Sequence, residues 1–384
     1  GHPWVYASGI RLQRHEGTVG DLAVLFDRND RFMGVGLFDP ASPIRIRVLH
    51  CGEPRRIDID WLAERVRAAS DRRQPLRDEA TSGFRLVHGA NDGLPGLVVD
   101  RYASTIVLKV YSAAWFPHLD NVLVVLREVT DPERVILRLS RTVQAAAGGV
   151  TDGADGQILH GTEPSGPVMF RENGLRFEAD PVRGHKTGFF FDQRDNRARV
   201  GTHCAGRSVL DAFAYTGGFS VYAARAGARS VVSLDASAPA LAAAGRNLAH
   251  NRQHAAIAAV QHRVVHGNAF EVMPRMRANG ERYDVVVLDP PAFAQASHQV
   301  DRALHKYARL IRMGLDVLSP NGMLVAASCS GRVTPERFRD VLSRAAERAR
   351  RPVDLVQQTG HALDHPIGFP EGRYLTCIFA RARA

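Results

Sequence analysis

The chain has 384 residues, of which 45% are hydrophobic and 23% are charged. This length exceeds what one ordinary hydrophobic core supports, and the mixture is unlike that of a disordered or fibrous chain, so we expect two or three globular domains. No uninterrupted apolar stretch reaches the roughly 18 residues of a membrane-spanning helix, which argues against a membrane protein.

The formal net charge of +10 is concentrated toward the C-terminal part of the chain. After residue 170 there are 30 basic and 19 acidic side chains, whereas the two kinds nearly balance before it. Such an excess is typical of a domain that meets a polyanion, although a solvated basic helix surface gives the same count. Only three of the 50 basic residues are lysine, and this arginine bias fits either phosphate recognition or a GC-rich genome.

The four cysteines lie far apart and form no Cys-x-x-Cys pair. Their spacing excludes a zinc ribbon and disfavours a disulfide framework, and we predict no metal site. No basic segment followed by an apolar one opens the chain, so no secretory signal is expected. A cytoplasmic location fits these features best.

The first 57 residues have the composition of short strands, and they predict a small β-barrel or part of one. The strands are expected at residues 21–27, 32–38 and 44–49. From residue 59 to residue 70 apolar side chains recur at helical spacing, which predicts a linker helix that ends before Gln74-Pro75.

Residues 83–180 indicate an α+β module in which strands bracket one amphipathic helix at residues 119–129. The strands are expected at 84–87, 94–100, 106–111 and 135–139, with two more around Asn173-Gly174. Residues 145–166 are rich in Gly, Ala, Ser and Thr without periodicity, which predicts a loop.

After Gly206 short apolar runs alternate with helical stretches. The expected strands are 209–213, 230–234, 262–265, 283–288 and 323–327, and the expected helices are 219–226, 239–251, 269–276 and 302–318. This alternation predicts a parallel sheet covered on both faces, with ligands at the carboxyl ends of its strands.

The first strand of this sheet leads into a candidate cofactor turn that contains Asp211, Phe213, Thr216, Gly217 and Gly218. Two adjacent glycines between a strand and a helix let the backbone approach a ligand closely, although many such joints use glycine only to turn. The pattern is not Gly-x-Gly-x-x-Gly, so the pyrophosphate cradle of a NAD enzyme is missing and hydride transfer is disfavoured.

Two further polar residues follow the next strands. Asp235 ends the second strand, where a carboxylate can accept hydrogen bonds from both ribose hydroxyls of an adenosine. It could instead cap the helix that begins near Ser237, but together with Gly217 and Gly218 we favour the ligand interpretation. Asn268 follows the third strand and is a candidate partner for the adenine amino group.

The fourth strand closes with the segment Asp289-Pro290-Pro291-Ala292-Phe293. The two prolines stiffen the chain and would hold the Asp289 carboxylate and the Phe293 ring at the edge of the sheet. Enzymes that methylate planar amines or ring atoms need such a polar group beside a flat wall. A purely structural turn is the alternative.

The fifth strand delivers Cys329 between Ser328 and Ser330. A buried cysteine is usually an inert small hydrophobe, and we interpret Cys51, Cys204 and Cys377 in that way. Cys329 differs because it falls at the predicted carboxyl edge, three residues before Arg332, where a thiolate could be stabilised. We therefore predict that Cys329 is a nucleophile.

At these residues the sequence resembles a known family. The segments 211–219, 289–293 and 328–331 together resemble the RlmI type of bacterial 23S rRNA cytosine-5 methyltransferase, which uses S-adenosylmethionine. The resemblance spans nearly the whole chain, with further matching segments at 1–5, 92–96, 184–188, 191–194, 364–366 and 370–375. It implies a PUA-like RNA-binding domain at 1–66 that lacks its first strand, a central α+β domain at 67–182, and a Rossmann-like class I methyltransferase domain at 183–384.

The resemblance also implies roles for individual residues. Cys329 would be the attacking thiol and Asp289 its acidic helper, while Pro290, Phe293 and Arg332 would meet the substrate. The cofactor contacts would be Asp211, Phe213, Thr216, Gly217, Gly218, Asp235, Asn268, Gln193 and Arg194. The family commonly has an acid where Asn268 stands, although an amide carbonyl could still accept from adenine.

These residues suit a mechanism in which the thiolate adds to cytosine carbon 6 and thereby activates carbon 5, on a base that is unpaired or extruded. Two alternatives stay open: an RNA or DNA methyltransferase acting on a base nitrogen, and a noncatalytic RNA-binding or ribosome assembly factor. The expected partner is 23S rRNA, no membrane contact is expected, and the oligomeric state is open, with a homodimer possible. The arginines 337–351 are a candidate RNA strip, but we favour an ordinary exposed helix, and we interpret His365 as structural.

Overall fold

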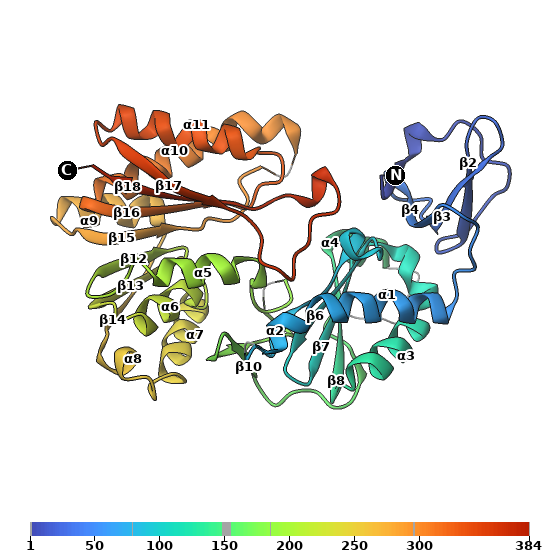
Figure 1. The fold of residues 1–384 in the computed structure, drawn as a ribbon, viewed down its shortest axis with the longest axis horizontal. Coiled ribbons are helices and arrows are strands. Elements are labelled where there is room, and N and C mark those ends of the chain that lie inside the picture. The colour runs from blue at the N-terminus through green and yellow to red at the C-terminus, as the bar shows by residue number, and fades with distance from the viewer. Residues whose placement is uncertain (1, 79, 148–154, 185, 295, 384) are drawn as a thin grey trace. The chain divides into compact units, whose positions relative to one another are not determined.

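The computed structural model describes residues 2–78, 80–147, 155–184, 186–294 and 296–383 (Figure 1). The chain divides into two compact units. The first unit comprises Gly1–Phe191 and Leu363–Pro370, and the second comprises Asp192–Ala362 and Glu371–Ala384. The boundaries predicted at residues 66 and 182 stay predictions. Of the matched segment 184–188, His185 lies outside the described residues.

The first unit begins with a four-stranded antiparallel sheet. Its strands lie in the order β1 (Trp4–Tyr6), β4 (Ile44–Cys51), β3 (Phe32–Phe38) and β2 (Leu22–Phe26). The three strands expected here from composition are confirmed. The following helix α1 (Ile59–Arg72) is capped by Asp58, whose side chain accepts from Trp61 N–H, and it buries Trp61, Leu62 and Val66.

The rest of the first unit is a five-stranded sheet with helices, in the order β5 (Gly83–His88), β6 (Leu97–Tyr102), β7 (Thr105–Val110), β8 (Arg134–Leu139) and β9 (Ile158–His160). The predicted amphipathic helix is α3 (Leu119–Thr130), and β10 (Val168–Glu172) pairs with β11 (Leu175–Ala179) around Asn173-Gly174.

In the first unit the structure differs from the sequence-based expectation in two places. Gln74-Pro75 ends α1 but also begins α2 (Gln74–Asp78), because proline is well suited to the first turn of a new helix. The expected loop at 145–166 contains the end of α4 (Arg141–Ala147) and the strand β9, which pairs with β8 and is too short to show periodicity. Residues 148–154 of that segment lie outside the described part of the chain.

The second unit contains a seven-stranded sheet in which the predicted strands are confirmed. Its order is β14 (Gln261–His266), β13 (Ser230–Asp235), β12 (Ser208–Ala212), β15 (Tyr283–Leu288), β16 (Leu318–Ser328), β18 (Thr376–Ala382) and β17 (Val353–Thr359). The first five are parallel, and β18 runs antiparallel to both its neighbours. The sheet is therefore mixed and not purely parallel, since the apolar pattern of β18 does not encode a direction.

Alternate residues of these strands enter two separate cores. Val285 and Val287 of β15 pack on the side of α5 (Arg194–Gly201) and α6 (Gly218–Arg225), whereas Val286 and Leu288 pack on the opposite side. The helices on that opposite side are α9 (Ala269–Ala278), α10 (Val300–Asp316) and α11 (Pro335–Arg348). The remaining helices are α7 (Ala238–Ala249) and α8 (Ala255–Ala259).

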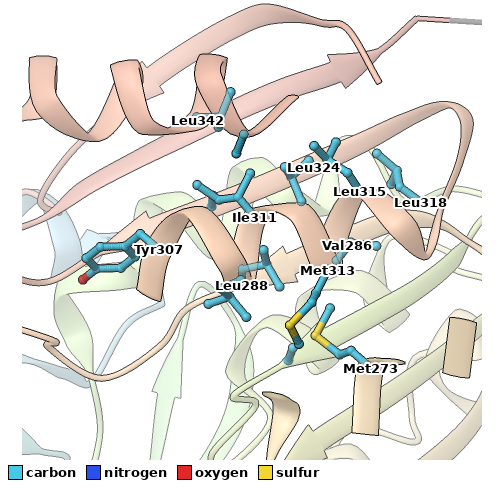
Figure 2. Packing of buried hydrophobic residues seen from close by; sticks show 14 of the residues in the cluster. Met273, Val286, Leu288, Tyr307, Ile311, Met313, Leu315, Leu318, Leu324 and Leu342 are labelled. Atoms are coloured by element: carbon cyan, nitrogen blue, oxygen red, sulfur yellow. The ribbon is translucent and has the colours of Figure 1, made fainter. Parts of the chain in front are cut away.

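The helix α10 has one strongly apolar face, which is buried against the sheet. Figure 2 shows Ile311 and Leu315 of this helix packed with Leu324 of β16, and all three are almost inaccessible to solvent. Burying a side chain of this kind stabilises the fold by roughly 1.5–3 kcal/mol. At Gly314 an added Cβ would lie 2.8 Å from a Leu288 methyl carbon, so glycine allows the close approach of α10 to β15. No helix in the described part of the chain is both long and apolar enough to cross a membrane.

Candidate active site

The turn after β12 has a backbone that ordinary residues adopt only at a cost. Phe213, Tyr215 and Gly217 have positive φ angles of 67°, 49° and 75°. A Cβ on Gly217 would lie 2.7 Å from the Ala244 Cβ of α7, so glycine is required there by both conformation and space. Strained non-glycine residues of this kind cluster where a ligand or a reaction needs them, and this turn is the predicted cofactor turn.

The two acids beside this turn differ in their environment. Asp235 is partly exposed, and each of its carboxylate oxygens accepts one backbone hydrogen bond, from Tyr215 N at 2.8 Å and from Ser237 N at 2.8 Å. A carboxylate has about four acceptor positions, so two remain for the hydroxyls of a ribose. Helix α7 is capped by Ser237, whose side chain accepts from Ala240 N, so the helix-cap interpretation of Asp235 is wrong and its remaining acceptor positions are available to a ligand.

Asp211 is fully buried, and its Oδ2 accepts from the backbone N–H and the hydroxyl of Ser220 in α6. Its Oδ1 is buried and has no hydrogen-bond donor among the described residues. Desolvation is the largest of the effects that raise the pKa of Asp211 to about 6. The Ser220 hydroxyl also bonds the Ser233 hydroxyl at 2.7 Å, which links α6 to β13.

The other residues of the predicted cofactor set lie at the same edge or beside it. Thr216 is buried, and its carbonyl accepts from the Asn247 amide at 2.8 Å. Asn268 is exposed after β14, where it caps α9 by accepting from Phe270 N at 3.0 Å. Arg194 lies fully buried at the start of α5. Gly218 opens α6, and an added Cβ there would lie 2.9 Å from the Arg197 Cδ.

Asp289 follows β15, next to the cofactor turn, and its backbone N–H donates to Ala212 O at 3.4 Å. Its Oδ1 accepts from the Gln193 side-chain amide at 2.9 Å, and the Gln193 carbonyl in turn accepts from Asn196 at 2.6 Å. Gln193 therefore fixes the orientation of Asp289. Because Asp289 keeps part of its surface exposed, a ligand can still reach it.

The pKa of Asp289 is raised to about 7. Desolvation is the largest cause, and the negative charges of Asp192 and Asp211 add to it, while the Gln193 hydrogen bond and Arg197 act in the opposite direction. At neutral pH this carboxyl group is present in both protonation states, so it can donate a hydrogen bond as well as accept one.

Cys329 stands just beyond the end of β16 and is partly exposed. Its thiol donates to Pro290 O at 3.5 Å, so the sulfur lies against the proline segment that follows Asp289. Ser330 ties the two segments together, since its hydroxyl oxygen accepts from Phe293 N at 3.1 Å and from Ala294 N at 3.3 Å. The predicted nucleophile and the predicted acidic segment are therefore neighbours.

A row of aromatic rings runs from the cofactor turn to this segment. Phe213 and Phe270 have ring centroids 6.4 Å apart, and Phe270 and Phe293 are 6.2 Å apart. Phe293 then contacts Tyr307 of α10 at 4.8 Å, and the Tyr307 hydroxyl bonds Ser330 at 2.9 Å. Phe213, Phe270 and Phe293 are partly exposed and Tyr307 is buried behind them, so the three phenylalanine rings provide an apolar wall between the predicted cofactor and nucleophile positions.

Sequence reasoning missed three polar residues of this arrangement. The negative charge of Asp192 raises the pKa of Asp289. Asn196 orients Gln193 by a hydrogen bond, and Ser330 holds the Phe293 segment. Asp192 lies in a segment that matches the family, and Ser330 lies next to the candidate nucleophile. These positions in the sequence could have marked both residues as part of the site. Arg332, predicted to meet the substrate, is exposed just after Cys329. Among the described residues no group of His, Cys, Asp or Glu side chains is placed to hold a metal ion.

Comparison with known families agrees with this geometry. Residues 153–371 match the family model of S-adenosylmethionine-dependent methyltransferases, and residues 1–50 match that of PUA-like domains. The chain belongs to the S-adenosylmethionine-dependent methyltransferase family, with a PUA-like domain at its N-terminal end, and its cofactor is S-adenosylmethionine. The strained turn, the free acceptor positions of Asp235 and the neighbouring aromatic rings fit the adenosine part of this cofactor.

Within this family the chain is of the RlmI type. It is 46% identical to the ribosomal RNA large subunit methyltransferase of Deinococcus radiodurans, over 99% of this chain and 93% of that one. It is 36% identical to ribosomal RNA large subunit methyltransferase I of Shewanella amazonensis, over 99% and 95% of the two chains.

Two solved structures share the fold over nearly the whole chain. One is SMU.776, described as a methyltransferase complexed with SAH, with a TM-score of 0.83, 21% identity, and coverage of 99% of this chain and 96% of that one. The other is described as an S-adenosylmethionine-dependent methyltransferase from Streptococcus mutans, with a TM-score of 0.82, 20% identity, and coverage of 99% and 95%. At these identities the likeness concerns the fold alone.

Proposed function

We propose that this protein methylates carbon 5 of a cytosine in large-subunit (23S) ribosomal RNA, with Cys329 as the nucleophile. The names of its relatives support ribosomal RNA as the substrate, and a cytoplasmic place of action follows from that substrate. The choice of carbon 5 rests on one observation: the partly exposed Cys329 thiol lies 3.5 Å from Pro290 O, in the segment headed by Asp289.

The cofactor is held, in this proposal, by the residues that surround the turn after β12. Asp235 accepts from the ribose hydroxyls with its remaining lone pairs, and Gly217 and Gly218 let the backbone approach. Asp211, Phe213, Thr216, Asn268, Gln193 and Arg194 complete the set. When bound, S-adenosylmethionine supplies an electrophilic methyl group for an electron-rich carbon.

Carbon 5 of cytosine is too poor a nucleophile to accept a methyl group unaided. In the proposed mechanism the Cys329 thiolate adds to carbon 6, so a carbon–sulfur bond forms and the electron pair of the 5,6 double bond becomes available at carbon 5. After methylation a base removes the carbon 5 proton, the double bond forms again, and the carbon–sulfur bond breaks to release the thiolate.

Asp289 is suited to assist the addition step. Negative charge develops on ring nitrogen 3 when the thiolate attacks, and a protonated carboxyl can donate a hydrogen bond to that nitrogen. The pKa of about 7 keeps a substantial fraction of Asp289 protonated near neutral pH, whereas an ordinary aspartate would be ionised. Gln193 is a positioning residue, because it acts on the base only through Asp289.

A cytosine within a helix cannot present carbon 6 to a thiol, so the target base must be unpaired or turned out of its stack. Phe293 is the proposed stacking surface, because its ring is partly exposed beside the nucleophile segment, whereas Pro290, the other residue predicted to stack on the base, is buried. Arg332, exposed just after Cys329, is the residue proposed to contact the neighbouring phosphate.

The decisive experiment is to trap the covalent adduct. The full-length protein is incubated with S-adenosylmethionine and 23S rRNA that contains 5-fluorocytidine, in which fluorine at carbon 5 cannot leave as a proton. We expect a stable protein–RNA adduct that mass spectrometry maps to Cys329. The matched control is Cys51→Ala, which removes an exposed cysteine of the first unit and should leave the adduct intact.

The Cys329→Ala variant separates this proposal from its alternatives. It should form no adduct and transfer no methyl group, while it binds S-adenosylmethionine like the unmodified protein. Methyl transfer that survives in Cys329→Ala would contradict the carbon 5 mechanism and support methylation of a base nitrogen. A wild-type chain that does not bind the cofactor in calorimetry would support a noncatalytic assembly factor.

A further inference from the structure

The exposed face of α10 carries a continuous row of positive charge. Arg302, Lys306, Arg309 and Arg312 recur at intervals of three or four residues and are all exposed, and His305 lies on the same side. This spacing places side chains on one face of a helix. It is the face opposite to the apolar one that Figure 2 shows packed on the sheet.

The charges of this row are not neutralised by ion pairs. The only acids of α10 are Asp301, which pairs with Arg337, and Asp316, which pairs with Arg277. Within the described part of the chain, none of the four basic residues of α10 forms an ion pair with an acid.

The arginine-rich helix α11 is different. Acidic side chains alternate with its arginines, with Glu336, Asp340 and Glu347 one to four positions from Arg337, Arg339, Arg344 and Arg348. Such a pattern is typical of an ordinary solvated helix with local charge compensation. The number of arginines alone drew attention to α11 as an RNA strip. The basic side chains without neighbouring acidic partners, however, lie on α10.

The row on α10 is also connected to the reacting segment. The Lys306 ammonium nitrogen lies 5.3 Å from the centre of the Phe293 ring, and the Arg309 guanidinium carbon lies 5.2 Å from the centre of the Phe270 ring. These are the two rings that line the edge between the cofactor turn and Cys329. The one acid of α9, Glu271, accepts from the Asn268 amide at 3.2 Å.

We propose that Arg302, Lys306 and Arg309 of α10 form the track that holds the phosphates of single-stranded RNA next to the target base. This inference rests on the proposed function and deepens it, because it names the surface that delivers the base to Phe293 and Cys329. Phosphate contacts of this kind set the register of the strand and carry no base information, so the track positions the RNA without selecting its sequence.

The size of the effect follows from counterion release. Each phosphate contact to a single strand contributes about 0.7 to the slope of log affinity against log salt, which corresponds to about 5-fold in affinity at about 0.1 M salt. Removing two contacts should therefore weaken RNA binding about 25-fold and lower the slope by about 1.4.

The test is an anisotropy titration of the full-length protein with a fluorescein-labelled oligocytidylate RNA, over a series of KCl concentrations. The double variant Arg302→Gln and Arg309→Gln should show both the weaker RNA binding and the lower salt slope. Its affinity for S-adenosylmethionine, measured by calorimetry, should be unchanged. Arg302→Lys combined with Arg309→Lys keeps the charges and should restore most of the slope. The matched control, Arg339→Gln with Arg344→Gln on α11, removes as many arginines and should bind like wild type.

Methyl transfer to a 23S rRNA transcript is measured separately, so that the two proposals can fail independently. If wild type transfers no methyl group but binds the oligonucleotide through α10, the proposed function fails and the track stands. If wild type does transfer methyl groups, the double α10 variant should raise KM for RNA and leave kcat at saturating RNA. A wild-type salt slope in that variant, or an equal loss in the α11 control, would overturn the track.

Discussion

Replacing Asp289 by asparagine should stabilise the second unit at neutral and alkaline pH while it impairs methyl transfer. The pKa of this carboxyl is raised from 3.8 to about 7, mainly by desolvation and by the charge of Asp192. Between pH 3.8 and about pH 7, the Asp289 carboxyl of the folded protein binds a proton that the same carboxyl of the unfolded chain does not. The free energy of unfolding therefore falls as pH rises through this interval, and the loss is complete above the folded pKa.

The magnitude follows from the shift. About three pKa units at about 1.4 kcal/mol each give a cost of roughly 4 kcal/mol near pH 8, with little or none near pH 4. Asparagine is neutral throughout and keeps the oxygen that accepts from Gln193. For a unit of roughly 150–250 residues this difference corresponds to a rise in Tm on the order of 10 °C at the higher pH.

The assay is thermal unfolding of the wild-type and Asp289→Asn proteins from acid to mildly alkaline pH. Asp284→Asn, at the other end of β15, is the matched control. Desolvation opposes ionisation there too, but hydrogen bonds from the Ser208 backbone and hydroxyl outweigh it and lower the pKa of Asp284. That variant should lose stability at neutral pH. A Tm difference for Asp289→Asn that does not grow with pH would refute the reasoning.

Two further substitutions test the geometry of the site. Gly217→Ala should destabilise the fold by roughly 1–3 kcal/mol and abolish cofactor binding in calorimetry, because the added Cβ would lie 2.7 Å from Ala244 at a φ of 75°. Gly206→Ala, at a φ of 69° with open space around it, should show the conformational cost alone and bind the cofactor normally. Ser330→Ala removes the acceptor that holds Phe293 N, and it should lower kcat by about 10- to 100-fold with cofactor affinity unchanged. An equal loss of cofactor affinity would instead mean that Ser330 supports the whole sheet edge.

The sequence by itself determined most helices and strands of the second unit. It also predicted that the candidate site residues gather at one edge of the sheet. Asp235 ends a strand, and Asp289 and Cys329 directly follow two others, as the apolar runs predicted. The carboxyl ends of parallel strands meet at one edge of a sheet, so the pattern of strands was enough to predict that these side chains gather there. The adjacent glycines after Asp211 were recognised in the sequence as the joint between a strand and a helix, and of the two only Gly217 has a left-handed φ, of 75°.

Only the tertiary structure decided which of these groups act on one another. The raised pKa of Asp289 depends on Asp192 and on burial, and the position of Phe293 depends on Ser330, so each arises between residues that are remote in the chain. The same holds for the antiparallel direction of β18 and for the unpaired charges of α10, since composition drew attention to the arginines of α11 instead. Sequence periodicity reports which face of an element is buried, but the electrostatics of a site depend on distances that exist only once the chain has folded.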